Sequence, residues 1–409
     1  MNDTKVLINI DILGNNVKKI TTKYKDYKYF IGVLKSSAYG HGEYIVNELV
    51  QNGINYIAVS IIEEAINIRK YNKDISILLL EPISLSNIDI AVKNNLTLTI
   101  CDLDYLKELL PLKKKLKLHI KVDSGMNRLG FKDKNEIKEA YDLIESDDNY
   151  TLEGIYTHFA TIGVFDNHYD NQVKSFTELT SLIDLNNIPI VHLGNSVIMI
   201  SHEKLSFATG IRMGIVLYGY NVSPESNSSG LKNKLRNIRN NYYQNKYNLS
   251  KLLYNVELDI TPSISMVTSI LQIKDVKKGE VIGYGAKYTA LEDIKVAILP
   301  VGYNNGIGKK NIDRYVIINN TKYYVVGEIS MNMMIIKIDN NVKITDEVYI
   351  VGNGITVSRL ASFNNISLPE QLISIGKNNK RVYIKNNNIE YIDEIRWLNV
   401  SQYMDNEKD

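Results

Sequence analysis

The chain has 409 residues, of which 44% are hydrophobic and 23% are charged, as expected of a soluble globular protein with room for two domains. Its 48 lysines and arginines nearly balance 46 aspartates and glutamates, which gives no reason to expect nucleic acid or an anionic membrane as the main partner. The single cysteine, Cys101, excludes an intrachain disulfide and a cysteine-based metal cluster, and we expect no metal site. The first ten residues lack the pattern of a secretory signal, and apolar runs such as 75–80 are too short to span a bilayer. We therefore expect a cytoplasmic protein.

Between about residues 10 and 220, short apolar runs alternate with amphipathic segments. The expected strands are 30–34, 56–60, 75–80, 96–100, 116–122, 152–158 and 189–193, with 205–212 as a weaker eighth strand. The expected helices are 12–24, 43–52, 63–70, 104–110, 135–144 and 172–185. Repeated strand–helix units in this number favour a closed parallel (β/α)8 barrel of the TIM type. An open, doubly wound α/β sheet is the structural alternative.

The pattern changes after residue 221. Residues 222–257 are rich in Asn and Ser, with six Lys or Arg and no acidic residue between Lys232 and Lys251. This composition predicts an inserted linker or a surface helix pair, and a docking surface for an acidic partner is the alternative. The polar tail is expected over 391–409.

A second, mostly β domain is expected over 258–390, after a barrel domain over 1–221. Short alternating runs bounded by turn residues indicate its strands, at 263–273, 294–301, 315–318, 323–326, 334–338, 347–351 and 381–384. Asn319 and Asn320 fit a tight hairpin turn, because asparagine tolerates positive φ.

In a parallel barrel the working residues lie at the carboxyl ends of the strands. Lys35 ends the first buried strand, where desolvation would lower the pKa of its amine and so suit Schiff-base formation with a carbonyl. A lysine at the exposed rim of the barrel is the alternative. The other polar residues at such ends are Lys121, His158, Asn195, Ser196 and Arg212.

Eight short blocks are specific only when they are taken together. They are KSSAYGHG from Lys35, KVDSGMNRLG from Lys121, GIYTHFA from Gly154, HLGNS from His192, GIRMGIVLYG from Gly210, GYGA from Gly283, VGY from Val301 and SM from Ser330. In this order, over about residues 7 to 385, the blocks resemble the alanine racemase family of fold-type III pyridoxal-phosphate enzymes.

The resemblance implies a two-base racemisation of L-alanine and D-alanine, with supply of D-alanine for a bacterial cell wall. Lys35 would hold pyridoxal 5'-phosphate as a Schiff base and act as one base. Tyr284, from the partner subunit, would be the base on the opposite face. Inversion at an α-carbon needs this arrangement, since one base removes a proton and the other returns one across the plane. A homodimer with shared active sites follows, because neither chain alone would assemble both bases.

The resemblance also assigns the contacts to the cofactor. Arg212 would face the pyridine nitrogen and, because a guanidinium keeps its own proton, would leave that nitrogen largely unprotonated. This limits side reactions such as transamination. His158 would stack near the ring and link Arg212 towards Tyr284. The phosphate would be held by Tyr39, Ser196 and the backbone amides of Gly214 and Ile215, with Asn195 supporting the same loop.

The substrate would meet a second set of residues. Arg128 would orient the phenolic oxygen of the cofactor and contact the substrate, and Lys121 would be carbamylated to position Arg128. An ordinary lysine in a salt bridge is the alternative for Lys121. Tyr303 and Met331, from the partner subunit, would narrow the access and favour a small side chain.

Several positions depart from the family pattern. Met213 replaces a usual proline, Asn305 and Asn332 stand where aspartates are usual, and Lys377 lies near the place of a phosphate-binding tyrosine. The two lost carboxylates lead us to expect a shifted or broadened specificity, for instance towards serine or a larger amino acid. The alternatives are thus a racemase of serine or of several amino acids, a decarboxylase of related fold, a carrier of pyridoxal phosphate, and a degenerate member without activity.

Overall fold

The computed structural model describes residues 4–161, 167–221, 231–247, 249–250, 258–311 and 313–393. They form two compact units. Leu13–Ser36 and Val46–Pro262 make up the barrel unit, and Ser37–Ile45 belongs to the second unit with the described residues before Leu13 and after Pro262. The first strand, β1 (Lys5–Asn9), pairs within the second unit, so this division differs at its start from the expected barrel domain over 1–221.

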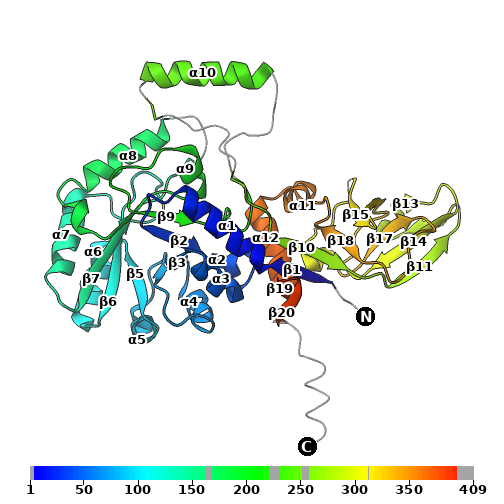
Figure 1. Cartoon of the computed structure of the whole chain (residues 1–409), viewed down its shortest axis with the longest axis horizontal. Helices are drawn as coiled ribbons and strands as arrows, with labels where there is room; N and C mark the ends of the chain where they lie inside the picture. Colours follow the sequence, from blue (N-terminus) through cyan, green and yellow to red (C-terminus); the bar gives the residue numbers. More distant parts are fainter. Residues whose placement is uncertain are drawn as a thin grey trace, which may run out of the picture. The chain divides into compact units, whose positions relative to one another are not determined.

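The barrel unit contains a closed parallel barrel of eight strands, which confirms the expected fold over the open-sheet alternative (Figure 1). Its strands are β2 (Tyr29–Val33), β3 (Tyr56–Val59), β4 (Ile77–Leu79), β5 (Leu96–Ile100), β6 (Leu116–Lys121), β7 (Tyr150–Tyr156), β8 (Ile190–His192) and β9 (Gly210–Met213). The weakly patterned eighth strand is β9, which pairs with both β8 and β2 and so closes the barrel.

Helices follow most of these strands. They are α1 (Ile10–Lys23), α3 (Val46–Gln51), α4 (Ile62–Arg69), α5 (Ile88–Lys93), α6 (Leu103–Leu109), α7 (Lys134–Glu145), α8 (His168–Leu179) and α9 (Ser196–Ser201), with short 3-10 segments η1 (Glu43–Ile45), η2 (Leu85–Asn87), η3 (Leu110–Leu112) and η4 (Leu185–Asn187). The helix α7 shows why these segments are helical: Ile137, Ala140 and Ile144 are buried on one face, and Asp133 caps its start. The helices α5 and α9 were not predicted, because six residues carry only a weak periodic pattern. The helix α3 has the same length but lies within the longer expected segment 43–52.

The expected insert over 222–257 contains a helix, α10 (Leu231–Tyr247). Most of the remaining residues of the insert lie outside the described chain. Within the described ranges, every helix is too short or too polar to cross a bilayer.

The second unit is built mainly from three sheets. A seven-stranded sheet has the order β16 (Thr321–Tyr324), β15 (Tyr315–Ile318), β18 (Val348–Val351), β10 (Ile264–Thr268), β1, β19 (Lys380–Lys385) and β20 (Asn388–Asp393). The smaller sheets join β11 (Gln272–Val276), β14 (Ile294–Leu299) and β17 (Met334–Ile338), and β12 (Val281–Ile282) with β13 (Tyr288–Thr289). The expected hairpin is confirmed: Asn319 and Asn320 have φ of 48° and 62° and connect β15 to β16. The strand β20 takes up the first residues of the expected tail over 391–409.

Two helices in the second unit were not expected from the sequence, which predicts only strands over 258–390. They are α11 (Val357–Asn364) and α12 (Leu368–Asn378). Each begins at a hydroxyl cap, in which Thr356 accepts from the amide of Arg359 and Ser367 accepts from that of Glu370. These two capping residues are a signal for a helix start that the sequence contains. The alternating runs around them predict strands and obscured it.

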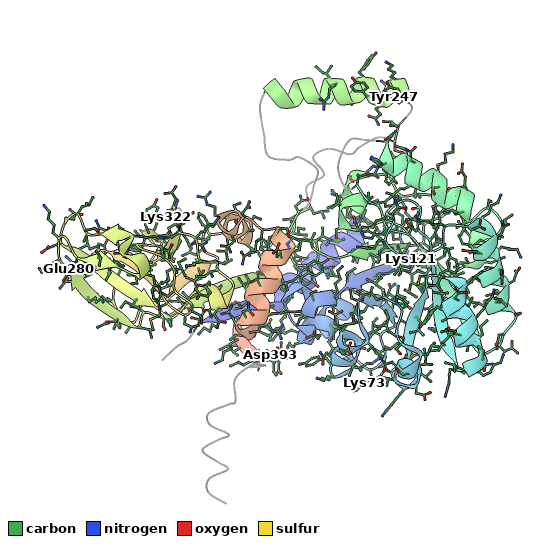
Figure 2. All side chains as sticks on the ribbon, turned by 180° about the vertical axis from the view of Figure 1, so that it is seen from behind. Lys73, Lys121, Tyr247, Glu280, Lys322 and Asp393 are labelled. Atoms are coloured by element: carbon green, nitrogen blue, oxygen red, sulfur yellow. The ribbon has the colours of Figure 1, made fainter. Side chains whose placement is uncertain are left out.

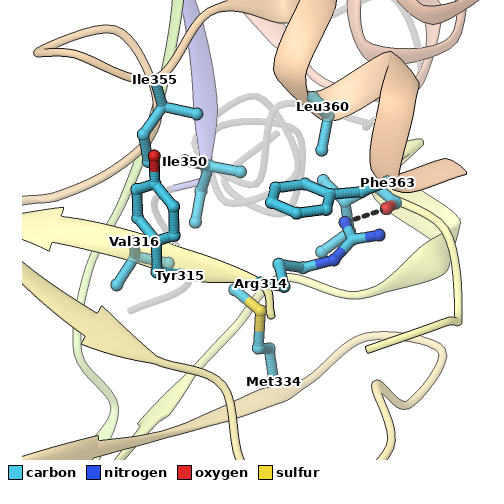
Figure 3. A pocket seen from close by; sticks show the side chains of 9 residues that line it. Arg314, Tyr315, Val316, Met334, Ile350, Ile355, Leu360 and Phe363 are labelled. Carbon is cyan, nitrogen blue, oxygen red and sulfur yellow. Dashed lines mark hydrogen bonds between the residues drawn. The ribbon is translucent and has the colours of Figure 1, made fainter. Parts of the chain in front are cut away.

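A buried arginine fixes α11 to the loop before β15. One Nη of Arg314 donates to Asn364 Oδ1 at 2.8 Å and to the carbonyl oxygen of Lys310 at 3.0 Å. Its guanidinium carbon lies 5.2 Å from the ring centre of Phe363. The same arginine borders a small, mostly apolar cavity (Figure 3).

Candidate functional site

Lys35 follows β2 and begins a single helical turn, α2 (Lys35–Tyr39), that is wound left-handed. The four residues after Lys35 all have φ between 49° and 55°. Left-handed backbone costs roughly 1–2 kcal/mol per residue with a side chain, so surrounding contacts must hold the turn. One of them is Glu64, whose carboxylate accepts the amide of Ser36 at 2.6 Å and the amide of Ser60 at 2.9 Å. The sequence analysis did not predict this turn.

Lys35 is half-buried in the barrel unit, so it is not a freely solvated residue of the rim. Burial lowers the pKa of its amine, and the charge of Arg128 lowers it further. Glu64 and Glu81 act in the opposite direction. A lowered pKa increases the fraction of neutral amine, which is the form that attacks a carbonyl.

Arg212 is buried in β9 and its guanidinium is held by several acceptors at once. One Nη donates to the carbonyl oxygen of His192 at 2.7 Å and to its Nδ1 at 2.8 Å. The other Nη donates to the carbonyl oxygens of Thr157 at 2.8 Å and Leu193 at 2.9 Å, and lies 3.2 Å from Nδ1 of His158. The side chain is therefore fixed in one orientation.

His158 is a neutral imidazole in this setting. Burial lowers its pKa to about 2, and the charges of Arg212, Lys121 and Arg128 act in the same direction. Because a guanidinium can only donate, Nδ1 of His158 accepts from Arg212 and the ring proton lies on Nε2. This pairing confirms that the structure brings His158 and Arg212 together, as the sequence blocks predicted.

Asn195, Ser196 and Gly214 lie together after the seventh and eighth barrel strands, in a cluster that we call the anion cradle. Asn195 Oδ1 caps α9 by accepting the amides of Val197 at 3.0 Å and Ile198 at 3.2 Å. The hydroxyl of Ser196, the first residue of α9, accepts the amide of Gly214 at 2.9 Å. Loops in this place commonly bind phosphate in such barrels. The hydroxyl of Ser196, which accepts from Gly214 but keeps its own proton to donate, and the adjoining backbone amide of Ile215 are donors that fit a phosphate group.

Lys121 ends β6 and is only 6% exposed (Figure 2). Its Nζ lies 4.4 Å from the ring centre of Tyr156. Burial holds its pKa well below the usual range, and Arg212 and Arg128 lower it further, while Asp123 opposes them. Lys121 is thus a buried amine beside two permanent cations.

Arg128 lies on a loop whose two ends, near Lys121 and Phe131, are joined by backbone hydrogen bonds. The amide of Phe131 donates to the carbonyl oxygen of Lys121 at 2.9 Å, and the amide of Asp123 donates to the carbonyl oxygen of Phe131 at 2.9 Å. Asp123 Oδ1 also accepts the amide of Asn127 at 2.9 Å, inside the loop. The guanidinium of Arg128 is exposed, yet its charge lowers the pKa of Lys35, Lys121 and His158.

The other predicted site residues belong to the second unit. Tyr284 begins the short segment η5 (Tyr284–Ala286) and is 69% exposed. Two backbone hydrogen bonds between residues 303–304 and 330–331 bring Tyr303 and Met331 together, and their side chains are 39% and 54% exposed. Tyr39 also falls in this unit, so the predicted site residues are divided between the two.

Sequence reasoning missed several polar residues of the barrel interior, all buried except the partly exposed Glu153. They are Tyr56, Thr97, His119, Glu153, Tyr156 and His192, all of which take part in hydrogen bonds or ring contacts inside the barrel. His192 and Tyr156 lie within the sequence blocks. The available signal was the presence of polar residues inside strands that are otherwise apolar.

Two family descriptions match this chain: "Alanine racemase, N-terminal domain" over residues 8–222 and "Alanine racemase, C-terminal domain" over residues 263–383. The chain belongs to the alanine racemase family. It is accordingly an amino-acid racemase, an isomerase.

Individual relatives agree with this assignment over nearly the whole chain. The alanine racemase of Borreliella burgdorferi is 33% identical over 390 residues, which cover 93% of this chain and 96% of that protein. The structure of an alanine racemase of Clostridium difficile 630 is 28% identical, has a TM-score of 0.83, and covers 96% of this chain and 99% of that one. A histidine racemase of Leuconostoc mesenteroides is 22% identical with a TM-score of 0.78, covers 93% of this chain and 98% of that one, and shares the fold alone.

Proposed function

We propose that this protein racemises alanine with pyridoxal 5'-phosphate bound through Lys35. The observation that carries the proposal is the half-buried amine of Lys35, with its pKa lowered, at the carboxyl end of a barrel strand. The fixed guanidinium of Arg212 and the neutral His158 influence the same electrostatic environment. Relatives with the name alanine racemase, matched over more than nine tenths of the chain, support the substrate.

The residues present fit this cofactor. Lys35 would hold its carbonyl carbon covalently, and Ser196, with the adjoining amides of Gly214 and Ile215, would bind its phosphate. Tyr39 would add a hydroxyl, and Asn195 would support the phosphate indirectly through the cap of α9. When bound, the cofactor withdraws electrons from the α-carbon of the substrate and so makes its hydrogen acidic.

Arg212 would face the pyridine nitrogen. Its hydrogen bonds to three carbonyl oxygens leave the guanidinium no freedom to rotate, and a guanidinium does not give up its proton readily. The ring nitrogen would then stay unprotonated, which moderates electron withdrawal and disfavours transamination. Nδ1 of His158 accepts from Arg212, so Nε2, on the other side of the ring, carries the proton and would donate the next hydrogen bond.

Two bases on opposite faces would carry out the inversion. Lys35 would hold or release the proton on one face, and Tyr284 of the partner subunit would do so on the other. The exposure of Tyr284 on its own chain supports this assignment, because a tyrosine committed to a second subunit cannot be packed into its own core. Tyr303 and Met331 from the partner subunit would narrow the access to the site.

A racemase of serine or of several amino acids is the second candidate, and Asn305 is the residue that favours it. The structure shows what Asn305 does within its own chain: its Oδ1 accepts the amide of Gly302 at 2.9 Å, and its Nδ2 donates to Asn379 at 2.8 Å. These bonds secure the turn that carries Tyr303. The effect of Asn305 on specificity would therefore act through the placement of Tyr303.

The test is racemisation by the purified protein with added pyridoxal phosphate. L-alanine, L-serine and L-lysine are supplied separately, and the D form of each is measured. We expect D-alanine to form fastest, and the Lys35→Ala variant to lose both racemisation and the visible absorbance of the bound cofactor. Turnover of serine or lysine alone would transfer the proposal to the second candidate. Binding of the cofactor without any turnover would contradict both.

A further inference from the structure

A line of polar groups runs through the interior of the barrel from the buried Arg212 to the partly exposed Glu153. Nη1 of Arg212 lies 2.8 Å from Nδ1 of His192, and Nε2 of His192 lies 3.1 Å from Nδ1 of His119. Nε2 of His119 lies 3.5 Å from Oε2 of Glu153. Both imidazoles are fully buried. Arg212 and His192 lie at the carboxyl ends of the strands, whereas Glu153 is linked to Tyr56 and Lys117 near their amino ends.

Arg212 sets the direction of every link in this line. A guanidinium only donates, so Nδ1 of His192 must accept, and a neutral His192 then carries its proton on Nε2. That proton is donated to Nδ1 of His119, which places the proton of a neutral His119 on Nε2, facing Glu153. Burial lowers the pKa of both histidines, which keeps them neutral. The two rings are therefore polarised in the same sense, from the cation towards the carboxylate.

Glu153 is ionised at the far end. Burial opposes its ionisation, but hydrogen bonds from His119, Lys117 and Tyr56 outweigh burial and lower its pKa to about 2. Tyr56 donates to Oε2 at 2.5 Å, Thr97 donates to Oε2 at 3.1 Å, and Lys117 pairs with Oε1 at 2.8 Å. These partners hold the carboxylate in place against His119.

Arg212 has no carboxylate among its own hydrogen-bond partners in the described chain. They are three carbonyl oxygens and two imidazole nitrogens. A buried cation is costly without a compensating negative charge. Tyr156, whose ring is stacked on His192 at 4.6 Å and 14°, adds only a neutral π face near the guanidinium. The route to a carboxylate is the one through His192 and His119, hydrogen-bonded as far as His119 and closed by the 3.5 Å contact between His119 Nε2 and Glu153 Oε2.

We propose that Glu153 is a positioning residue for the racemase reaction: it acts through His119 and His192 as the remote counterion of Arg212. The inference rests on the proposed function, because it assumes that Arg212 faces the ring nitrogen of the cofactor. Glu153 stabilises the protonated guanidinium and fixes the tautomers that hold it. Loss of its charge leaves Arg212 less well fixed, and an Arg212 that turns away from the ring nitrogen no longer keeps that nitrogen unprotonated.

The first arm of the test needs no activity. In the purified full-length protein, 15N NMR of labelled histidine distinguishes Nδ1–H from Nε2–H tautomers, and signals are assigned by comparison with His119→Gln and His192→Gln. We expect both rings in the Nε2–H form, and a shift of both signals in Glu153→Gln. Lys117→Met, which removes the charged partner of Glu153 but leaves the imidazoles, Tyr56 and Thr97 intact, should retain the Nε2–H form. An Nδ1–H tautomer at either ring of the unmodified protein overturns the proposal, even if Glu153→Gln does not fold.

The second arm measures the side reaction in the holoenzyme. Alanine and pyridoxal phosphate can exchange amino and oxo groups to give pyruvate and pyridoxamine phosphate, a balanced reaction without an external oxidant. We expect Glu153→Gln to raise the pyruvate formed per D-alanine on the order of tenfold, since an Arg212 that is less well fixed no longer directs its N–H donors at the ring nitrogen, which can then be protonated. Lys117→Met should leave the ratio unchanged.

The two arms separate the possible failures. An unchanged ratio in Glu153→Gln, with the predicted tautomers present, makes Glu153 a purely structural residue and overturns the proposal. Absence of D-alanine with the unmodified protein contradicts the proposed function instead, and the tautomer measurement still decides whether the relay exists.

Discussion

The protonation state of Lys121 depends on burial and on the charges that surround its amine. It is a buried lysine whose nearest permanent charges, Arg212 and Arg128, are cations, and only Asp123 opposes them. Its lowered pKa favours the neutral amine, which can attack carbon dioxide to form a carbamate and release a proton. The product is an anion between two arginines. Carbamylation would thus replace the repulsion between the Lys121 cation and the two arginines by an attraction between a carbamate anion and the same arginines.

We predict that Lys121 carries this carbamate. Protein equilibrated with 13C-bicarbonate should show one carbamate carbon signal, and Lys121→Met should lack it. Lys132→Met is a suitable control, since Lys132 is an exposed lysine on the same loop. A spectrum without the signal in the unmodified protein would leave Lys121 as an ordinary amine and refute the assignment.

His158 makes the fold sensitive to acid. Its pKa is about 2 in the folded chain and about 6.5 in the unfolded chain, so between these values the unfolded chain binds one more proton. Stability from this residue therefore rises with pH through this window and is lost as the pH falls below 6.5. Between pH 6.5 and 5 the loss is about 2 kcal/mol.

Urea unfolding followed by circular dichroism at pH 7 and pH 5 checks this prediction. The difference in the free energy of unfolding between the two pH values should be about 2 kcal/mol smaller in His158→Gln than in the unmodified protein. His168→Gln, at an exposed histidine, should leave the difference as it is. An equal acid loss in His158→Gln would mean that His158 is protonated in the folded protein.

At this scale the sequence predicts Lys35, Lys121, His158, Ser196 and Arg212 as site residues, and the structure places all five in the barrel unit. Each stands at a strand end in a recognisable block. The line of polar groups from Arg212 through His192 and His119 to Glu153 could not be predicted. It depends on which side chains face each other across the barrel, and strand periodicity carries no such information.

The element that most directly shapes the anion cradle is α9, a helix of six residues with a side-chain cap. Short helices depend on their caps, because few of their backbone amides have partners within the helix. Asn195 supplies two of those partners and places Ser196 beside the amide of Gly214. The cap and the cradle are therefore coupled.

We predict that substitutions of Asn195 separate capping from charge. Asn195→Ala should lower the free energy of unfolding by about 1 kcal/mol. Asn195→Asp should keep the stability, because aspartate caps equally well, but should weaken pyridoxal phosphate binding by repelling the phosphate. Chemical unfolding and titration with the cofactor measure the two effects. Unweakened binding by Asn195→Asp would place the phosphate elsewhere.

Two elements mark the limit of prediction from local pattern. The helices α11 and α12 were missed because alternating runs dominate their neighbourhood, although Thr356 and Ser367 are standard capping residues. The left-handed turn after Lys35 was unpredictable for a different reason. Serine, alanine and tyrosine do not favour positive φ, so tertiary contacts such as that of Glu64 must impose it.

For the whole molecule, the main finding is the division of the predicted site residues between two units. The barrel unit holds Lys35, His158 and Arg212, and the second unit holds Tyr284, Tyr303 and Met331. The closed barrel and the β-rich second domain were predicted from the sequence. The pairing of β1 with β10 and β19 was not, because a strand of five residues at the start of a chain gives no sign of its partners.

The most direct test of the account is complementation between two inactive variants. Lys35→Ala lacks one base and Tyr284→Phe lacks the other, and we expect each homodimer to lose racemisation by on the order of 10²-fold or more. In a mixed dimer, one site combines the intact Lys35 of one chain with the intact Tyr284 of the other. Random exchange of equal amounts should therefore restore about a quarter of the unmodified activity. A mixture that stays inactive after verified subunit exchange would contradict an active site shared between two subunits.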